Sequence, residues 1–265
     1  MKIHCLIVVG NRSLTNAIHS ISILNKNGIL VHVLWREGSK PRSFQIQTET
    51  EVEVPKISLS KARNLLLTSM KNCSSLEEND VICLADDDGT IPDNFGDNIM
   101  LVFADYRIKW ALGCFLPIDQ ILDTTRFPQI QIRKCSRKEI LRISSSLGLY
   151  VRYGVLKSVG FFDENLGVGA RIGVGEDTEM SLRLRDFTGE SPYFPILVQH
   201  HPYKRGKYSP EEKFQFLAYL AVRDFKMYFS LIRYTLRIIM LERMNLILCF
   251  KLYLVELKYW KYARK

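Results

Sequence analysis

Three acidic residues in a row are the first candidate for chemistry in this chain. Asp86, Asp87 and Asp88 directly follow the apolar run 81–85. Such a run is typical of a buried parallel strand, and carboxylates at its carboxyl end reach the place where open α/β sheets bind ligands. Adjacent carboxylates repel one another unless a cation or donor groups neutralise them, and their oxygens suit Mg²⁺ or Mn²⁺ holding a diphosphate. The alternative is a solvated acidic turn.

A second acidic pair, Glu176-Asp177, opens a helix predicted over 176–187. The pair follows the segment 160–175, whose five glycines indicate a long loop with unusual backbone conformations. The positive end of a helix dipole keeps carboxylates ionised, which suits a general base. The alternative is the ordinary preference of Asp and Glu for the first turn of a helix.

Two further groups offer ligands or positive charge. His200-His201 closes a short strand predicted from residue 195. A neutral imidazole commonly binds transition metals, and a strand-end histidine on the surface is the alternative. Arg63 and Asn64 lie near the start of a helix predicted over 60–72. There they offer a cation and an amide to a phosphate or a nucleobase, although an ordinary solvated helix face would contain the same residues.

The elements around these groups indicate an α/β protein with a mainly parallel sheet. Residues 3–9 form a β-branched apolar run, residues 14–24 have helical spacing, and residues 29–35 form a second apolar run. A strand–helix–strand unit of this length starts a parallel sheet. The other predicted elements are strands at 81–85, 110–116, 148–152 and 195–198, helices at 60–72, 92–106 and 176–187, and irregular structure at 36–55 and 117–140.

The positive charge of the chain is confined to its last part. Residues 204–265 contain 14 of the 37 Lys and Arg and 5 of the 28 Asp and Glu, so the first 203 residues contain 23 of each sign and the whole net charge of +9 lies after them. We therefore predict a neutral α/β domain at 1–203 and a basic helical extension at 204–265. The neutral domain argues against nucleic acid as a partner, and the extension favours an anionic one.

The extension mixes apolar and basic residues from 214 to 260. Charged residues at 233, 237, 242 and 243 interrupt every stretch before it reaches the roughly 20 apolar residues of a spanning helix. One interpretation is an interfacial helix on an anionic membrane surface. The other is a helical subdomain that packs on the α/β domain or forms a homodimer.

Cysteine usage and the first residues bear on the compartment. None of the six cysteines belongs to a C-x-x-C pair, which argues against zinc or a disulfide framework and favours a reducing compartment. No secretory signal is readable ahead of the run 3–9. We expect a cytoplasmic protein that is peripheral on the inner face of the cell membrane if the extension binds lipid.

The order of these pieces along residues 3–203 resembles a family 2-type inverting glycosyltransferase of the bacterial polysaccharide-assembly kind. After the strand–helix–strand start, the motifs that carry the resemblance are Ser60-Lys61-Ala62-Arg63-Asn64, Leu84-Ala85-Asp86-Asp87-Asp88, Gly160-Phe161-Phe162-Asp163-Glu164, Gly175-Glu176-Asp177-Thr178-Glu179 and the strand-end histidines. The resemblance implies the GT-A fold, a Rossmann-like, mainly parallel sheet between helices. Here that fold would be followed by a C-terminal helical extension.

Site residues follow from the same resemblance. Asp177 is the implied general base, with Glu176 beside it as the other catalytic residue. The implied metal ligands are Asp86, Asp88 and either His200 or His201, and the implied nucleotide contacts are Arg12, Arg63, Asn64, Asp86 and Asp87. A single base without a covalent nucleophile implies inversion at the anomeric carbon. The implied reaction moves a sugar from a nucleotide-diphosphate sugar, in the first place a UDP-sugar, to a hydroxyl of a glycan or lipid-linked acceptor, with Mn²⁺ or Mg²⁺ as cofactor.

The chain departs from the pattern in two places that bear on the nucleotide. Glu37 is the acid nearest to the end of the second strand, where many relatives have an Asp that contacts the base. The first strand runs into Gly10-Asn11-Arg12 without the usual Pro-Thr or Pro-Tyr. A sugar-phosphate nucleotidyltransferase is the second interpretation, but it needs a longer glycine-rich loop at this point to hold a triphosphate. A non-catalytic module that binds nucleotide-sugars is the third.

Overall fold

The computed structural model describes residues 1–10, 14–36, 38–41, 47–73, 76–117, 132–202, 209–241 and 246–263. The chain forms two compact units. Unit 1 contains residues 1–164 and 176–203, and unit 2 contains residues 165–175 together with 204–265. The sequence predicted a division after residue 203, and the structure adds the segment 165–175 to the C-terminal unit.

Unit 1 is built on a sheet that has eight strands in the described part of the chain, in the order β3-β2-β1-β4-β7-β5-β8-β6. The strands are β1 (Ile3–Val9), β2 (Leu30–Arg36), β3 (Thr50–Val54), β4 (Val81–Asp86), β5 (Trp110–Pro117), β6 (Arg133–Lys134), β7 (Leu149–Arg152) and β8 (Pro192–His201). The pairs β3-β2, β2-β1, β1-β4 and β5-β8 are parallel, whereas β7 is antiparallel to β4 and β5, and β6 is antiparallel to β8. The sheet is therefore mixed and mainly parallel, as predicted.

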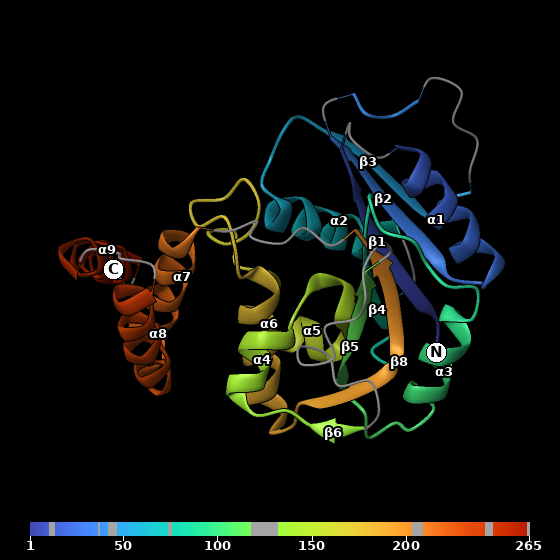
Figure 1. Cartoon of the computed structure of the whole chain (residues 1–265). Helices are drawn as coiled ribbons and strands as arrows, with labels where there is room; N and C mark the ends of the chain where they lie inside the picture. The colour runs from blue at the N-terminus through green and yellow to red at the C-terminus, as the bar shows by residue number, and fades with distance from the viewer. Residues whose placement is uncertain are drawn as a thin grey trace. The chain divides into compact units, whose positions relative to one another are not determined.

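Helices cover both faces of this sheet (Figure 1). They are α1 (Leu14–Lys26), α2 (Leu59–Cys73), α3 (Phe95–Phe103), α4 (Arg137–Ile143), α5 (Tyr153–Val159) and α6 (Glu176–Thr188), with a 3-10 turn at Ser146–Gly148. Buried residues of α1 and α3 share one core with Ile3, Cys5 and Ile7 of β1, and α2 contacts β1 from the opposite face. Because successive side chains of a strand point to opposite faces, every residue of β1 is buried, which explains its continuous apolar run.

The strand order fixes where a ligand is expected to bind. The chain leaves β1 toward β2 and β3 on one side and returns to β4 on the other side of β1. In open α/β sheets, ligands bind beyond the carboxyl ends of the strands at such a switch point. Asp86 is the last residue of β4 and lies in register with Val8 of β1, so the acidic run begins at this position.

Short elements lie where the sequence predicted irregular structure. β3 is an edge strand of five residues in the segment 36–55, and β6 and α4 follow residue 132. The start of α4 is fixed by a capping box, in which Ser136 and Glu139 bind each other's backbone N–H groups. Residues 118–131, the larger part of the predicted irregular segment 117–140, lie outside the described residues.

Unit 2 is a small helical unit. It contains α7 (Pro210–Arg223), α8 (Tyr228–Leu241), α9 (Leu246–Ala263), a 3-10 turn at Phe225–Met227 and the segment 165–175. Ser209 and Glu212 form a capping box at the start of α7, with Pro210 in its first turn. α7 packs against both α8 and α9. None of the helices in the described residues is both long and apolar enough to cross a membrane.

Candidate active site

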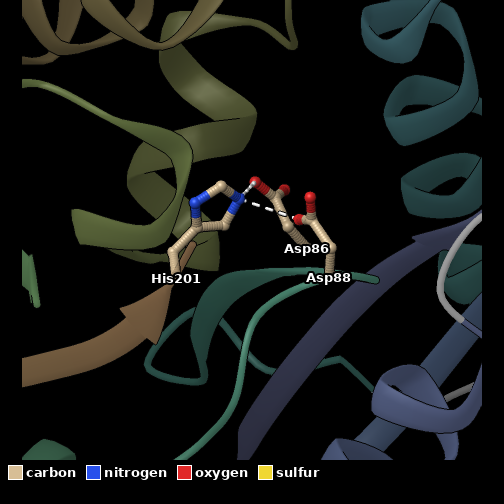
Figure 2. Close-up of side chains that lie close together, drawn as sticks. All are labelled: Asp86, Asp88 and His201. Carbon is tan, nitrogen blue, oxygen red and sulfur yellow. Dashed lines mark ion pairs between the residues drawn. The ribbon is translucent and has the colours of Figure 1, made fainter. Parts of the chain in front are cut away.

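Asp86, Asp88 and His201 bring three potential metal ligands together (Figure 2). One ligand atom from each residue lies within 4.8 Å of the others. His201 Nε2 is 2.8 Å from Asp88 Oδ1 and 3.7 Å from Asp86 Oδ2. The two carboxylates come from the end of β4 and the turn after it, and the imidazole comes from the end of β8. Two segments far apart in the sequence therefore form one group of ligands.

The orientation of His201 is fixed by a backbone contact. Its Nδ1 lies 2.7 Å from the carbonyl oxygen of Pro202, and since a carbonyl can only accept, Nδ1 carries a proton and donates it. Nε2 therefore faces the carboxylates, an arrangement typical of metal-binding histidines. Burial lowers the pKa of His201, but the hydrogen bond to Asp88 and the charges of Asp86 and Asp88 outweigh it, so the pKa is raised.

This set of donors fits a divalent cation. A proton on Nε2 of His201 balances the charge of the two carboxylates, and a metal ion can take the place of that proton. Carboxylate oxygens suit both Mg²⁺ and Mn²⁺, whereas an imidazole nitrogen favours a transition metal. The three residues therefore fit Mn²⁺ better than Mg²⁺.

The neighbouring His200 makes a different contact and is not part of this group. Its backbone pairs with that of Thr90, with N···O distances of 2.8 and 2.9 Å. A Cβ atom on Gly89 would lie 3.0 Å from the His200 carbonyl oxygen, so glycine allows the turn after β4 to approach β8 closely. This approach brings His201 to the carboxylates, whereas the sequence left the choice between the two histidines open.

Asp87 links the ends of β1 and β4. Its Oδ2 accepts a hydrogen bond of 2.8 Å from the backbone N–H of Gly10. Burial raises the pKa of Asp87, the Gly10 N–H lowers it, and the negative charges of Asp88 and Asp86 raise it further, so the pKa is raised overall. Arg36, the last residue of β2, lies close to Gly10. A Cβ atom built on Gly10 would be 3.4 Å from Nη2 of Arg36. Sequence reasoning did not single out Arg36, which the strand order brings to this position.

Arg63 lies between the two acidic groups of the site. Its Nη2 is 3.5 Å from Asp86 Oδ1, and its Nη1 is 3.4 Å from Glu176 Oε1. The Arg63 side chain is only 3% exposed, and its guanidinium lies 5.5 Å from the centre of the Phe162 ring. A buried guanidinium needs negative partners, and here they come from β4 and α6. Arg63 therefore connects the metal-ligand group with the predicted catalytic pair.

Glu176 and Asp177 lie in the first turn of α6, as predicted. Burial, the charge of Asp177 and, to a smaller extent, Asp86 raise the pKa of Glu176 to about 7 against the opposing effect of Arg63. Burial also raises the pKa of Asp177, although the N–H and hydroxyl of Thr178 donate to its Oδ1 at 2.7 and 3.3 Å. Two neighbouring carboxyl groups with raised pKa values are a common feature of catalytic sites.

Asn64, a predicted nucleotide contact, and Arg183 of α6 hold the backbone around this pair. The Asn64 amide nitrogen donates to the carbonyl oxygen of Phe162 at 2.8 Å and to Glu164 at 3.1 Å, while its oxygen accepts from the Phe162 N–H at 2.9 Å. Arg183 donates to three successive carbonyl oxygens, those of residues 159, 160 and 161, and to Glu179. Arg183 therefore forms an i,i+4 ion pair with Glu179 within α6 and holds the backbone of residues 159–161.

Arg12, a predicted nucleotide contact, lies outside the described residues, as does Glu37, the acid nearest to the end of the second strand. Asp86, Asp87 and Arg63 lie at the edge where β1 and β4 end, and Asn64 lies beside them on α2 with its amide engaged by the segment 162–164.

No family model matches the chain, and no curated protein is similar to it in sequence. Solved structures are nevertheless similar in fold. S. aureus TarS 1–349 in complex with UDP-GlcNAc superposes with a TM-score of 0.61 at 14% identity, over 92% of this chain and 74% of that one. The mannosyltransferase PcManGT from Pyrobaculum calidifontis, in complex with GDP-Man and Mn²⁺, gives a TM-score of 0.53 at 11% identity, over 84% of this chain and 64% of that one. GalNAc-T7 with UDP, GalNAc and Mn²⁺ gives a TM-score of 0.53 at 10% identity, over 83% of this chain and 50% of that one.

The chain has the GT-A fold. Its mixed, mainly parallel sheet with helices on both faces corresponds to that of GT-A glycosyltransferase structures, as the motif order along residues 3–203 implied. The chain spans 40% of the length of a longer TarS structure, so it corresponds to a part of that protein. At identities of 10–14% the likeness concerns the fold, and the function has to be argued from the site.

Proposed function

We propose that the chain is a metal-dependent glycosyltransferase that moves a sugar from a nucleotide-diphosphate sugar to a hydroxyl of a glycan or lipid-linked acceptor with inversion. The observation that carries the proposal is that Arg63 contacts both Asp86 of the metal-ligand group and Glu176 of the acidic pair. Solved structures of the same fold are described as complexes with UDP-GlcNAc or with GDP-Man and Mn²⁺, which supports this class of donor.

In this proposal Asp86, Asp88 and His201 hold the divalent ion, with Mn²⁺ as the best match. A bound ion supplies positive charge for the diphosphate of the donor and of the leaving nucleotide. The residues of the chain fix where that charge is located, because His201 is oriented by Pro202 and Asp86 by Arg63. Asp87, which follows β4, and Arg36, at the end of β2, are proposed to line the nucleotide side of the site. Arg12 stays a predicted nucleotide contact.

Asp177 is the proposed general base. Thr178 holds its Oδ1, so its other oxygen, Oδ2, is assigned the proton of the acceptor hydroxyl as that oxygen attacks the anomeric carbon. Glu176 is assigned a supporting role, because it is buried and paired with Arg63. Its raised pKa lets it bind a proton near neutral pH, which reduces the repulsion between the two carboxylates. Loss of a general base typically lowers turnover by about two to four orders of magnitude.

A binding experiment tests the proposal without knowledge of the acceptor. The full chain is heated with UDP, GDP, UDP-GlcNAc, GDP-Man and ATP, each with and without Mn²⁺. We expect at least one nucleoside diphosphate or its sugar to raise the melting temperature with Mn²⁺ and to have little effect with EDTA. Stabilisation by ATP alone would instead favour a nucleotidyltransferase, and stabilisation by none would contradict a donor site.

We further propose that unit 2 places the enzyme on an anionic membrane surface, on the cytoplasmic side. Large apolar side chains are exposed on both of its last two helices, namely Phe229, Ile232 and Leu236 on α8 and Leu246, Ile247, Phe250, Leu254 and Val255 on α9. Exposed basic side chains accompany them, namely Arg233, Arg237, Lys251 and Lys258. Exposed apolar side chains accompanied by Lys and Arg suit the boundary between lipid headgroups and acyl chains.

Vesicle sedimentation separates this proposal from a homodimer. The full chain is expected to sediment with vesicles containing an anionic lipid at low salt, and Arg233→Glu/Arg237→Glu is expected to weaken this binding at least tenfold. Lys109→Glu/Lys138→Glu is the matched control, because it makes the same charge change at exposed positions of unit 1. If the chain does not bind anionic vesicles and light scattering gives the mass of a dimer, the exposed apolar side chains form an assembly interface.

A further inference from the structure

Arg171 and Glu256 form a bidentate ion pair within unit 2. Arg171 Nη1 is 2.7 Å from Glu256 Oε1, and Nη2 is 2.8 Å from Oε2. The Glu256 side chain is 1% exposed, and Gln215 donates a further hydrogen bond of 3.0 Å to its Oε1. A buried ion pair is a weak source of net stability, but it holds its two partners in one geometry. Here it holds the segment 165–175 to α9.

The segment makes further close contacts with the helices of unit 2. The Arg171 guanidinium lies 4.3 Å from the ring centre of Tyr259 on α9 and 5.7 Å from that of Tyr219 on α7. Gly175 has φ of +92°, and a Cβ atom there would lie 2.2 Å from the ring of Phe216 on α7. The backbone of the segment therefore lies directly against α7, at a distance that only glycine allows.

The segment has little regular structure of its own. Its internal backbone hydrogen bonds include Gly167 N–H to Ile172 O, Ala170 N–H to Gly167 O and Ile172 N–H to Asn165 O. Four of its eleven residues are glycines, which lose more conformational freedom on ordering than other residues. Contacts from outside the segment are therefore needed to hold it in one conformation, and the helices of unit 2 supply them.

The segment is joined covalently to the acidic pair at its C-terminal end and follows Glu164 at its start. A single peptide bond connects Gly175 to Glu176, and Asp177 follows. At the other end Glu164 accepts a hydrogen bond from Asn64. The acidic pair is therefore the immediate continuation of the segment along the chain, with no residue between them.

We propose that the C-terminal helices of this chain are a scaffold for the segment 165–175, and that Arg171 and Glu256 are positioning residues for the acidic pair. The inference rests on the proposed function, because it takes Asp177 as the base of the transfer. It gives unit 2 a role in catalysis that is independent of lipid. It also accounts for a fully buried acid in the basic extension, where Glu256 is one of 5 acids among 14 Lys and Arg.

The test uses Glu256→Gln in the full chain, with Glu211→Gln as the matched control. The control removes one carboxylate from an exposed position of α7 and is expected to behave as the wild type. In Glu256→Gln, hydrogen exchange of the amides in 165–175 is expected to accelerate at least tenfold. A misplacement of about 1 Å can cost about a hundredfold in rate, so kcat is expected to fall by about tenfold to a hundredfold, with the donor KM within about twofold of wild type.

The outcomes separate this inference from the proposed function. Unchanged exchange in 165–175, or faster exchange with unchanged kcat, would overturn the positioning role. Equal losses in donor binding and kcat would also overturn it, since they would indicate general damage to unit 1. If the wild type turns over no nucleotide-sugar, the proposed function is wrong. The exchange data still test whether the C-terminal helices hold the segment 165–175 in one conformation. If Glu256→Gln does not fold, Arg171→Lys decides by the same criteria, because it keeps the charge and loses the bidentate contact.

Discussion

The raised pKa of Glu176 makes a prediction about stability. The pKa lies at about 7 in the folded chain, against an ordinary value of 4.5 for a glutamate, and burial is the largest cause. Between these two values the folded state binds more protons at this group than the unfolded state does, so the free energy of unfolding falls as the pH rises. One pKa unit corresponds to about 1.4 kcal/mol. We therefore expect Glu176 alone to lower the stability of the metal-free protein by about 2 to 3 kcal/mol between pH 5 and pH 8.

The measurement is urea unfolding in EDTA at intervals between these pH values, for the wild type and Glu176→Gln. The variant cannot titrate, so the decrease in stability with pH should be smaller by about 2 to 3 kcal/mol than in the wild type. Glu190→Gln is the control, because it removes a carboxylate whose side chain is 47% exposed, and it should keep the wild-type pH dependence. If the free energies of unfolding of Glu176→Gln and the wild type change in parallel with pH, titration of Glu176 is not the cause of the pH dependence.

Three further predictions concern the metal, the base and the packing of the sheet. Asp88→Asn should abolish the effect of Mn²⁺ on nucleotide binding and leave the circular dichroism spectrum unchanged, and unchanged nucleotide affinity in Mn²⁺ would remove Asp88 from the site. Asp177→Asn should lose about two to four orders of magnitude in kcat while binding the donor normally, and a mild loss accompanied by a severe one in Glu176→Gln would assign the base to Glu176. Gly113→Ala should destabilise the chain by about 3 kcal/mol or more in urea unfolding, because its Cβ atom would lie 2.2 Å from the carbonyl oxygen of Leu197. A change in the free energy of unfolding below about 1 kcal/mol would show that β5 and β8 separate easily.

The parts of the fold that the sequence predicted are those with strong local patterns. β1 and β4 are continuous apolar runs because both faces of the sheet are covered. The acidic residues at the end of β4 and in the first turn of α6 are also recognisable in the sequence. The first group follows the apolar run 81–85, and the second follows the glycine-rich segment 160–175. The two acidic groups could therefore be assigned to one site before the contact through Arg63 was known.

The features that were missed depend on contacts between distant segments. The choice of His201 over His200 follows from the backbone pairing of His200 with Thr90, which no local pattern encodes. β7 runs antiparallel between two strands, and a strand of four residues does not indicate its direction. The association of the segment 165–175 with the C-terminal helices depends on the pairing of Arg171 with Glu256, two residues that look like solvated charges in the sequence.

Release of nucleoside diphosphate tests whether the chain transfers a sugar from a nucleotide-sugar. The full chain is incubated with UDP-GlcNAc, other UDP-sugars and GDP-Man, with vesicle-borne or soluble glycan acceptors, and with Mn²⁺ or EDTA. We expect release of UDP or GDP from at least one donor with Mn²⁺, none with EDTA, and a loss of at least a hundredfold in both Asp88→Asn and Asp177→Asn. Release of pyrophosphate from a nucleoside triphosphate and a sugar phosphate, with no nucleoside diphosphate from any donor, would contradict the proposed sugar transfer.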